Sequence, residues 1–533
     1  MSDKLAHQII AVFLTFQFLL IVSTFQDYGM SWDQPGLHEY GETIVRFYSS
    51  LGHDTTAQTH ELRFYGGFFE LSAKAVEVLT RLGWLEARNL TSAFFGLLGV
   101  WATFRLGMVA FGPLVGLTAA LFLTLTPAYY GHQFINPKDM PFAALYVLSL
   151  SYVIAMALEF PEMRLTNTIK AGLSIGAALG ARAGGVVLIL LMVGGLCVSA
   201  LCNLSGRDRR LLTKKLLTTG VTHACTVIGL AWCVMLLSWP FAWRRHSGWP
   251  LFGIPKFNAP FVALKVFSKF PWNSTVFFDG RLLKWSDLPS DYLVTLFANC
   301  LPEFVLAGWF LGIVAILRAY RAGHRVFART TLAWLILFVA GAGPLAGILL
   351  THAFLYDNFR HVLFTLPPLI ILSAAGVWAF VRLFTNETVR LGLLVVYVLG
   401  VLTTIADMRA LYPYEYTYCN HLIAGGMLQA NQRFEMEYWG TSFREAVLWL
   451  DTYYRPSGLS EIVYSSNAEP ELVDYYIRQL HPGEVRFRHA TNGEKATVYL
   501  LLRRQRQQDE LSWGKVVHTI GREGVPFLDV VEP

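Results

Sequence analysis

The chain has few charged residues for its length. Lys, Arg, Asp and Glu make up 15% of its 533 residues, whereas a typical soluble domain has about 25%. Hydrophobic residues reach 54%, and the mean hydropathy is +0.43. This composition excludes a large soluble enzyme and predicts a polytopic membrane protein. The net charge of +6 does not indicate a nucleic-acid partner, because much of the basic charge falls in short loops between apolar runs.

Cysteine is also scarce, and its spacing predicts no metal site. Five of the six cysteines lie in or beside apolar runs, and Cys419 is alone in the polar tail. The sequence contains no CxxC pair, so we expect neither a disulfide framework nor a structural zinc ion. It also contains no internal repeat and no low-complexity tract.

Long hydrophobic runs, by contrast, are frequent. Eleven of them approach or exceed the roughly 17 residues that a membrane-spanning helix needs. They are Ile9–Phe25, Leu90–Val109, Leu114–Tyr130, Met140–Leu158, Ile169–Ala183, Val186–Leu204, Leu216–Trp239, Leu293–Leu317, Thr331–Leu350, Val362–Leu383 and Leu391–Asp407. Only Lys4 is basic ahead of the first run, and no small-residue cleavage site follows it, so we expect an uncleaved first span.

The distribution of Lys and Arg predicts the orientation of these spans. With the N-terminus in the cytoplasm, every inside loop carries basic residues, as the positive-inside rule requires. They are Arg105; Arg164 and Lys170; Arg207, Arg209, Arg210, Lys214 and Lys215; Arg318, Arg321, Arg325 and Arg329; and Arg382 and Arg390. An odd number of spans then places the C-terminus outside.

The composition changes near Met408, where the apolar runs stop. We therefore expect a membrane domain over residues 1–407 and an extracytoplasmic α/β domain over 408–533. Within the second domain the pattern predicts two helices and four strands: Phe443–Tyr454, Pro470–Leu480, Glu461–Ser465, Val498–Leu502, Val516–Ile520 and Phe527–Val531.

The membrane domain has two large outer loops, 26–89 and 240–292. In the first loop, apolar residues recur at helical spacing and predict a helix that lies on the membrane surface. They are Leu37, Tyr40, Ile44, Phe47 and Tyr48. A second surface helix is predicted over Phe68–Leu82.

Three short outer segments carry polar groups at the same membrane face. They contain Asp33; Asn136, Lys138 and Asp139; and Asp357, Asn358, Arg360 and His361. Charges at membrane depth are costly and mark functional sites by default.

Each of these residues also has a structural interpretation. Asp33 or Asp357 could cap a helix, and Lys138 could form a surface ion pair with Asp139. Arg360 could be an interfacial anchor, and His361 could simply pack at a helix end. The convergence of three short segments on one face favours a shared site.

The residue types indicate group transfer from a lipid phosphate. Carboxylates can deprotonate a hydroxyl, and Arg and Lys can hold and neutralise a phosphate. A base and a phosphate site at a membrane surface together suggest glycosyl transfer with the lipid phosphate as leaving group.

The order of these segments resembles the GT-C superfamily of integral-membrane glycosyltransferases. In particular, it resembles the group that includes the protein O-mannosyltransferases and the lipid A aminoarabinose transferases. SWDQP, which contains Asp33, resembles the first acidic motif of that group, and INPKDMPF, which contains Asp139, resembles the second. FRHVLFTLPPLIILSAAG resembles a later span that begins with Arg360, with His361 where Tyr is usual. The likeness covers Ile9 to Leu383, and EYWGTSFREAVLWL in the tail resembles the outer domain of some bacterial members.

The resemblance implies an inverting transfer from a polyprenyl-phosphate-linked sugar to a hydroxyl of a lipid, glycan or protein. Asp33 would be the general base, and Asp139 would orient the acceptor or share that role. Lys138 and Arg360 would bind the donor phosphate. The residues that line the site would be Asn136, Asn358, His361 and Glu39.

The same resemblance implies a bacterial inner membrane and no metal or other cofactor. One position departs from the family pattern. The first motif often reads Asp-Glu, but here Gln34 follows Asp33, so a second carboxylate is lost or its role passes to Glu39.

Two other functions remain open from the sequence. A lipid-linked sugar translocator would also need a lipid path and phosphate-binding cations, but it would need no base, and it often shows symmetry between its halves. A structural or sensory module would place the function in the outer domain beyond Met408.

Overall fold

The computed structural model describes residues 1–533 except 204–208, 245–250, 269–274, 322–327, 352, 354, 359, 458, 481–485, 492 and 505–513. Arg207 and Arg325, two of the residues that predict the orientation, lie outside the described residues. So do the side chains of Arg209, Arg210, Lys214, Lys215 and Arg329.

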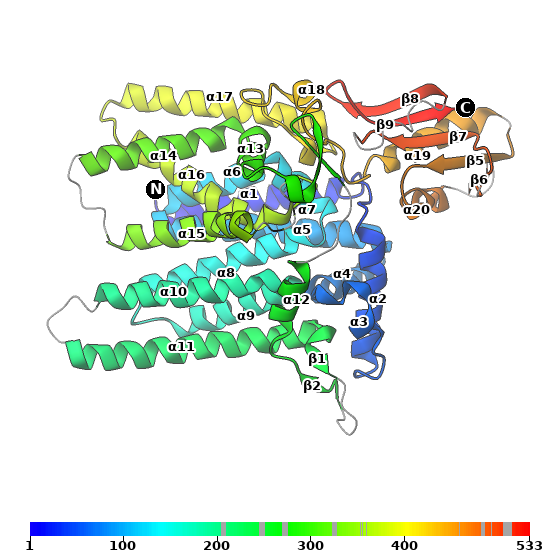
Figure 1. Ribbon diagram of the computed structural model, residues 1–533. Coiled ribbons are helices and arrows are strands. Elements are labelled where there is room, and N and C mark those ends of the chain that lie inside the picture. Colours follow the sequence, from blue (N-terminus) through cyan, green and yellow to red (C-terminus); the bar gives the residue numbers. More distant parts are fainter. Residues whose placement is uncertain are drawn as a thin grey trace.

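Long apolar helices form a bundle (Figure 1). Among the described residues, nine helical stretches are long and apolar enough to cross a membrane. They correspond to α1 (Asp3–Thr24), α5 (Trp84–Phe111), α8 (Asp139–Glu159), α10 (Val186–Asn203), α11 (Arg209–Ser238), α14 (Glu303–Arg321), α15 (Ala328–Thr351), α16 (Leu366–Val381) with the turn η5 (Arg360–Thr365), and α17 (Glu387–Leu411). The predicted polytopic α-helical fold with a C-terminal α/β domain is confirmed.

The two remaining predicted spans are also helical. α9 (Leu165–Ala181) has 17 residues and packs between α8 and α11. α6 (Pro113–Thr124) and α7 (Pro127–Ile135) form a pair bent by 63° that counts as a tenth crossing if it is one broken span. The bend falls at Pro127, since proline has no N–H to continue the helical hydrogen bonds.

A second proline divides the predicted span Leu293–Leu317. The structure has α13 (Tyr292–Cys300), then Pro302, then α14. α13 has nine residues, too few to cross a bilayer. The predicted span therefore starts too early, and Cys300 lies outside the crossing.

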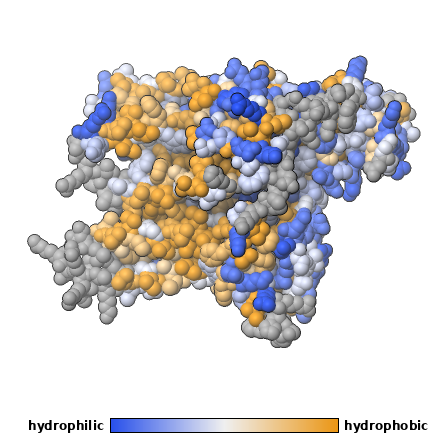
Figure 2. Space-filling view, viewed as in Figure 1, coloured by the Kyte–Doolittle hydropathy of each residue, from blue (hydrophilic) through white to orange (hydrophobic). Residues whose placement is uncertain are grey.

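The N-terminus and the C-terminal sheet lie at opposite ends of the bundle (Figure 1). At the sheet end, which we call the outer end, lie α2 (Gln34–Ser49), α3 (Thr56–Thr59) and α4 (Phe68–Thr80). Figure 2 shows apolar side chains over the helical bundle and more hydrophilic ones over the outer end.

The apolar face of α2 is covered by protein. Leu37, Tyr40, Ile44 and Phe47 are all at most 2% exposed. The helix that the spacing predicts is therefore present, but its apolar face packs against other parts of the chain, including α4 and α3, and not on lipid.

The second outer loop contains short elements. They are η3 (Pro240–Ala242), β1 (Trp243–Arg244), β2 (Ile254–Pro255), α12 (Ala259–Phe267), β3 (Thr275–Phe278), β4 (Arg281–Lys284) and η4 (Trp285–Asp287). β1 pairs with β2, and β3 with β4, both antiparallel.

In its described residues, the C-terminal domain is a five-stranded mixed sheet with two α-helices. Its strand order is β6-β5-β7-β9-β8, with β5 parallel to β6 and β7. The elements are α19 (Phe443–Tyr454), β5 (Glu461–Ser466), α20 (Glu471–Gln479), β6 (Arg486–His489), β7 (Val498–Leu502), β8 (Lys515–Arg522) and β9 (Val525–Glu532). The sequence pattern missed β6, because RFRH is a short and charged edge strand.

Between α17 and α19 the chain runs along the outer end of the bundle. The boundary predicted at residue 408 falls inside α17, which continues to Leu411. We call residues 412–442 the connecting segment; it contains η6 (Glu415–Thr417) and α18 (Met427–Ala430). The phenolic oxygen of Tyr28 donates to Glu415 at 2.9 Å, and Asn420 N donates to Asn299 O at 2.8 Å. This segment therefore packs against the membrane domain.

Candidate active site

Asp33 lies immediately before α2, yet it does not cap that helix. Its backbone is helical, with φ −79° and ψ −20°, and its side chain makes no capping hydrogen bond. Its Oδ2 lies 2.7 Å from Lys138 Nζ and 3.3 Å from Arg360 Nη1. The carboxylate is thus held by two cations from other loops, and the capping interpretation is wrong.

A side-chain turn at the start of α8 fixes Lys138 and Asp139. Asn136 is fully buried, and its Oδ1 accepts the N–H of Asp139 at 2.9 Å. Its Nδ2 donates to Asp139 Oδ2 at 3.0 Å. The Lys138 side chain is only 10% exposed and points to Asp33. The interpretation of Lys138 and Asp139 as a surface ion pair is therefore wrong.

Arg360 joins carboxylates from three segments. Nη1 contacts Asp33, Nη2 lies 3.3 Å from Asp357 Oδ2, and Asp139 Oδ2 lies 3.9 Å from Nη1. The guanidinium also lies over the rings of Tyr356, at 4.7 Å, and of Trp439, at 5.2 Å. Because its side chain is 2% exposed, Arg360 is not an interfacial anchor that extends to water.

Arg182 is part of this arrangement, although the sequence analysis did not select it. It follows α9, and its Nη2 lies 2.5 Å from Asp139 Oδ1. Its guanidinium and the Lys138 ammonium both lie near the Tyr65 ring, at 5.6 and 5.2 Å. The available signal was its position: Arg182 lies at the end of the predicted span Ile169–Ala183 that faces outside in the predicted orientation, against the positive-inside rule.

These groups form a compact cluster of balanced charge. We call it the outer charge cluster, and it consists of Lys138, Arg182, Arg360, Asp33, Asp139 and Asp357. Among the described residues, Nε of Arg182, Nε of Arg360 and Nδ1 of the adjacent His361 are buried without a hydrogen-bond partner. Buried polar groups are nearly always paired, so these three nitrogens retain unused hydrogen-bonding capacity at the cluster.

The ion pairs keep Asp33 and Lys138 charged. Burial alone would raise the pKa of Asp33, but the charges of Lys138 and Arg360 lower that pKa to about 2. Burial likewise acts to lower the pKa of Lys138, and the Asp33 carboxylate outweighs it, so that the pKa is raised. Nearby opposite charge is thus the dominant effect on both groups.

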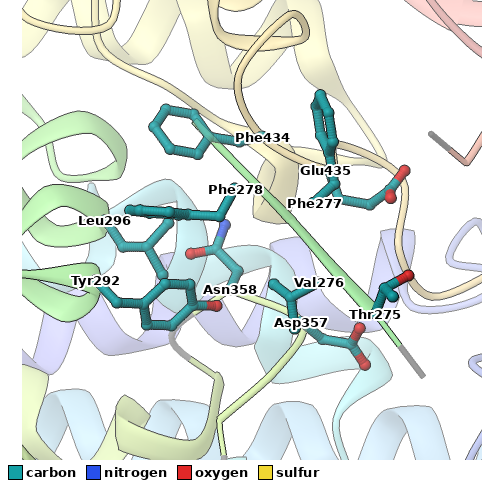
Figure 3. Close-up of a pocket in the computed structure, with 10 residues that line it drawn as sticks. All are labelled: Thr275, Val276, Phe277, Phe278, Tyr292, Leu296, Asp357, Asn358, Phe434 and Glu435. Carbon is teal, nitrogen blue, oxygen red and sulfur yellow. The ribbon is translucent and has the colours of Figure 1, made fainter. Parts of the chain in front are cut away.

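Asn358 and His361 lie at the edges of the cluster. Asp357 and Asn358 both have left-handed backbone, with φ of +51° and +62°. They line a pocket together with Thr275, Val276, Phe277, Phe278, Tyr292, Leu296, Phe434 and Glu435. Figure 3 shows Asn358 toward the aromatic end with Tyr292 and Phe278, and the carboxylates of Asp357 and Glu435 toward the other end. The His361 ring packs against Tyr356 with centroids 4.6 Å apart.

Glu39 does not join the cluster. It is exposed on α2, whereas its neighbour Tyr40 is fully buried. Glu39 lies six positions after Asp33, about 9 Å along the helix axis. Glu39 therefore does not supply the second carboxylate that the family motif often has at the position of Gln34. Gln34 is buried, and its Nε2 donates to Asn89 at 3.1 Å.

The tail contributes directly to this end of the bundle. The indole nitrogen of Trp32 donates to the carbonyl of Tyr438 at 3.1 Å, and the backbone N–H of Trp32 donates to Trp439 at 3.2 Å. A Cβ at Gly29 would lie 2.0 Å from the carbonyl oxygen of Thr441, so only glycine permits this approach. The first acidic motif and Gly29 thus pack on residues 438–441, to which the sequence pattern assigned no role.

One group of described residues could hold a metal ion. His38, Glu42 and Glu77 place ligand atoms within 4.8 Å of one another on α2 and α4. Lys74 Nζ lies 2.8 Å from Glu42 and 2.9 Å from Glu77. One ammonium group therefore already contacts both carboxylates.

No family model and no curated protein sequence matches the chain. Among solved structures, the chain is similar to ArnT from Cupriavidus metallidurans in the apo state, with 14% identity and a TM-score of 0.49 over 99% of this chain and 98% of that one. For ArnT bound to undecaprenyl phosphate the values are 13% and 0.47, over 98% and 97%.

The chain is also similar to the archaeal oligosaccharyltransferase AglB from Archaeoglobus fulgidus, solved with an inhibitory peptide and a dolichol-phosphate. The identity is 12% and the TM-score 0.47, over 94% of this chain and 70% of that one. ArnT is a lipid A aminoarabinose transferase, and both proteins are members of the GT-C superfamily.

Proposed function

We propose that this protein is a membrane glycosyltransferase that moves a sugar from a polyprenyl-phosphate carrier to an acceptor hydroxyl on the extracytoplasmic side. The observation that carries the proposal is the contact of one carboxylate, Asp33, with two cations, Lys138 and Arg360, at the outer end of the bundle. A base for a hydroxyl and cations for a leaving phosphate are the groups that this reaction needs.

In the proposed reaction, Asp33 accepts the proton of the acceptor hydroxyl while the acceptor oxygen attacks the anomeric carbon. The bond between that carbon and the phosphate oxygen breaks, and the polyprenyl phosphate leaves with the electron pair. Arg360 and Lys138 neutralise the leaving phosphate, Arg360 through a planar fork and Lys138 as a point charge. Attack from the side opposite the phosphate inverts the anomeric centre.

Binding of the donor would also activate the base. A pKa of about 2 makes Asp33 a weak base while Lys138 and Arg360 hold it, since an efficient base has a pKa near the working pH. A donor phosphate would compete with Asp33 for both cations. The carboxylate would then lose its main stabilising charges, and its pKa would rise.

For Asp139 we propose a positioning role and not that of a second base. Its two oxygens contact Arg182 at 2.5 Å and Asn136 at 3.0 Å, and its side chain is 4% exposed. An acceptor hydroxyl would have to displace one of these partners. Asp139 can instead orient Arg182 and Arg360, whose unpartnered Nε groups are available to an anion.

The experiment that tests this function is a transfer assay in proteoliposomes. The donors are undecaprenyl phosphates that carry a radiolabelled hexose or pentose, and the readouts are label in water-soluble or lipid acceptors and release of undecaprenyl phosphate. We expect release with the wild-type chain and none with Asp33→Asn. Movement of intact donor across the bilayer, without release and unchanged in the variant, would support the translocator alternative and contradict the proposal.

A further inference from the structure

Two cysteines that are distant in the sequence meet at the outer end of the bundle. Cys300 is the last residue of α13, and Cys419 follows η6 in the connecting segment. Their Sγ atoms lie 3.6 Å apart, and the two residues are 1% and 2% exposed. Sequence spacing gave no reason to pair them, because 119 residues separate the two.

Hydrogen bonds hold the two segments together on both sides of the sulfur pair. Asn420 N donates to Asn299 O at 2.8 Å, which joins the residues next to each cysteine. The Asn420 side chain donates to two further carbonyls of the same turn, at 2.6 and 2.9 Å. Tyr418, on the other side of Cys419, donates to Glu303 at 3.3 Å. Bond formation would shorten the separation of the sulfur atoms from 3.6 Å to the roughly 2.05 Å of a disulfide.

The pair lies outside the crossing helices. Cys300 precedes α14, and Cys419 follows the end of α17 at Leu411. In the orientation that the proposed function assumes, both cysteines face the extracytoplasmic compartment, where disulfides form and persist. The other four cysteines, Cys197, Cys202, Cys225 and Cys233, lie in α10 and α11.

We propose that Cys300 and Cys419 form a disulfide that fastens the connecting segment to the turn between α13 and α14. A disulfide-bearing thiol oxidoreductase of the extracytoplasmic compartment is the oxidant. One cysteine thiolate attacks its disulfide and releases one of its sulfurs, and the second thiolate then attacks the mixed disulfide. One S–S bond forms and one breaks, and the two electrons and two protons end on the dithiol of the oxidant.

Thiol–disulfide exchange takes place while the connecting segment docks on the membrane domain. In the packed state the hydrogen bond with Cys300, together with burial, raises the pKa of the Cys419 thiol. A buried and protonated thiol is a poor nucleophile. The oxidant therefore meets these thiols before packing is complete, and packing then protects the bond from reduction.

The disulfide would support the outer charge cluster. The Asn358 amide nitrogen lies 3.8 Å from Cys300 Sγ, two residues before Arg360. At its other end, the connecting segment carries Trp439 over the Arg360 guanidinium. A covalent link between Cys300 and Cys419 would join the turn that Asn358 contacts to the segment that carries Trp439. It would therefore act on Arg360 only through these neighbours, in a positioning role.

The test counts free thiols in the purified full-length chain. The starting variant replaces Cys197, Cys202, Cys225 and Cys233 by Ala, which leaves only the proposed pair. After denaturation in a PEG-maleimide, we expect no adduct before reduction and two after it. Matched variants that also carry Cys300→Ala or Cys419→Ala should each show one adduct before reduction.

A second readout is the melting temperature. Reductant should lower it in the starting variant and leave it unchanged when both remaining cysteines are replaced by Ala. Two adducts without reductant would overturn the proposal. If two adducts form, a reporter fused after Pro533 tests the assumed orientation. An extracytoplasmic reporter leaves the proposed function standing, whereas a cytoplasmic reporter contradicts both the disulfide and the proposed function.

Discussion

Asp33 and Lys138 form an ion pair of 2.7 Å between two different outer loops. The same Asp33 oxygen also contacts Arg360 at 3.3 Å. In the proposed function a donor phosphate binds the same two buried cations, so the donor and Asp33 would compete for them. Donor binding would then raise the pKa of Asp33 and so make it a better base.

Removal of the Lys138 charge should weaken donor binding. Hydrogen bonds to charged groups contribute about 1.5–3 kcal/mol, so Lys138→Met should raise the KM for the donor about tenfold or more. The matched control is Lys74→Met, because Lys74 also contacts two carboxylates, but at the α2–α4 surface. Steady-state kinetics with varied donor measure the difference. Equal KM values for the two variants would argue against a phosphate contact.

Loss of the Asp33 carboxylate should strongly lower the rate of transfer. General-base catalysis contributes about 10²–10⁴-fold, so Asp33→Asn should lower kcat by that factor. Asp54→Asn is the control, since Asp54 also lies in the first outer loop and pairs with Arg46 at 3.5 Å. Full activity of Asp33→Asn with its true substrates would contradict the assignment of the base.

Arg182 should be needed for both stability and activity. Arg182→Met leaves the buried Asp139 with a broken ion pair, which costs about 3 kcal/mol or more in typical buried pairs. The melting temperature should fall, and the double variant Arg182→Met/Asp139→Asn should recover it while remaining inactive. A double variant as unstable as the single one would show that the pair is not the source of the loss.

Glu415 should make stability depend on pH. It is 2% exposed, and burial raises its pKa to about 7 despite the hydrogen bond from Tyr28. The unfolded chain releases this proton near pH 4.3, so the folded state holds the extra proton between these values. Stability therefore falls as pH rises through this window.

Replacement by Gln removes the charge. Glu415→Gln should melt above the wild-type chain at pH 8 and close to it at pH 5. The exposed Glu39→Gln serves as the control and should keep the wild-type pH dependence. The expectation fails if Glu415→Gln and the wild-type chain lose stability in parallel as the pH is raised.

Local pattern predicted much of the fold. Apolar length located a helix at each of the eleven expected spans, and periodicity located α2, α4 and α19. Pro127 and Pro302 break two of these spans. The breaks were not predicted, because an average of hydropathy does not register a single missing N–H. The edge strand β6 was missed for a related reason, since its RFRH sequence carries no alternating apolar face.

The site was predicted in part. Asp33, Lys138, Asp139 and Arg360 come together as the motifs suggested. Trp439 could not be foreseen, because its contact with Arg360 depends on the long-range path of the connecting segment. Glu39 was predicted to line the site but is exposed on α2. Its closeness to Asp33 along the chain does not determine which face of α2 it occupies.

The most direct test is a structure of the purified protein with a polyprenyl phosphate bound. We expect the phosphate oxygens within hydrogen-bond distance of Lys138 Nζ and the Arg360 guanidinium, with Asp33 released from Lys138 and facing the same cavity. A phosphate bound elsewhere, with the 2.7 Å contact between Asp33 and Lys138 intact, would contradict the proposed transfer site.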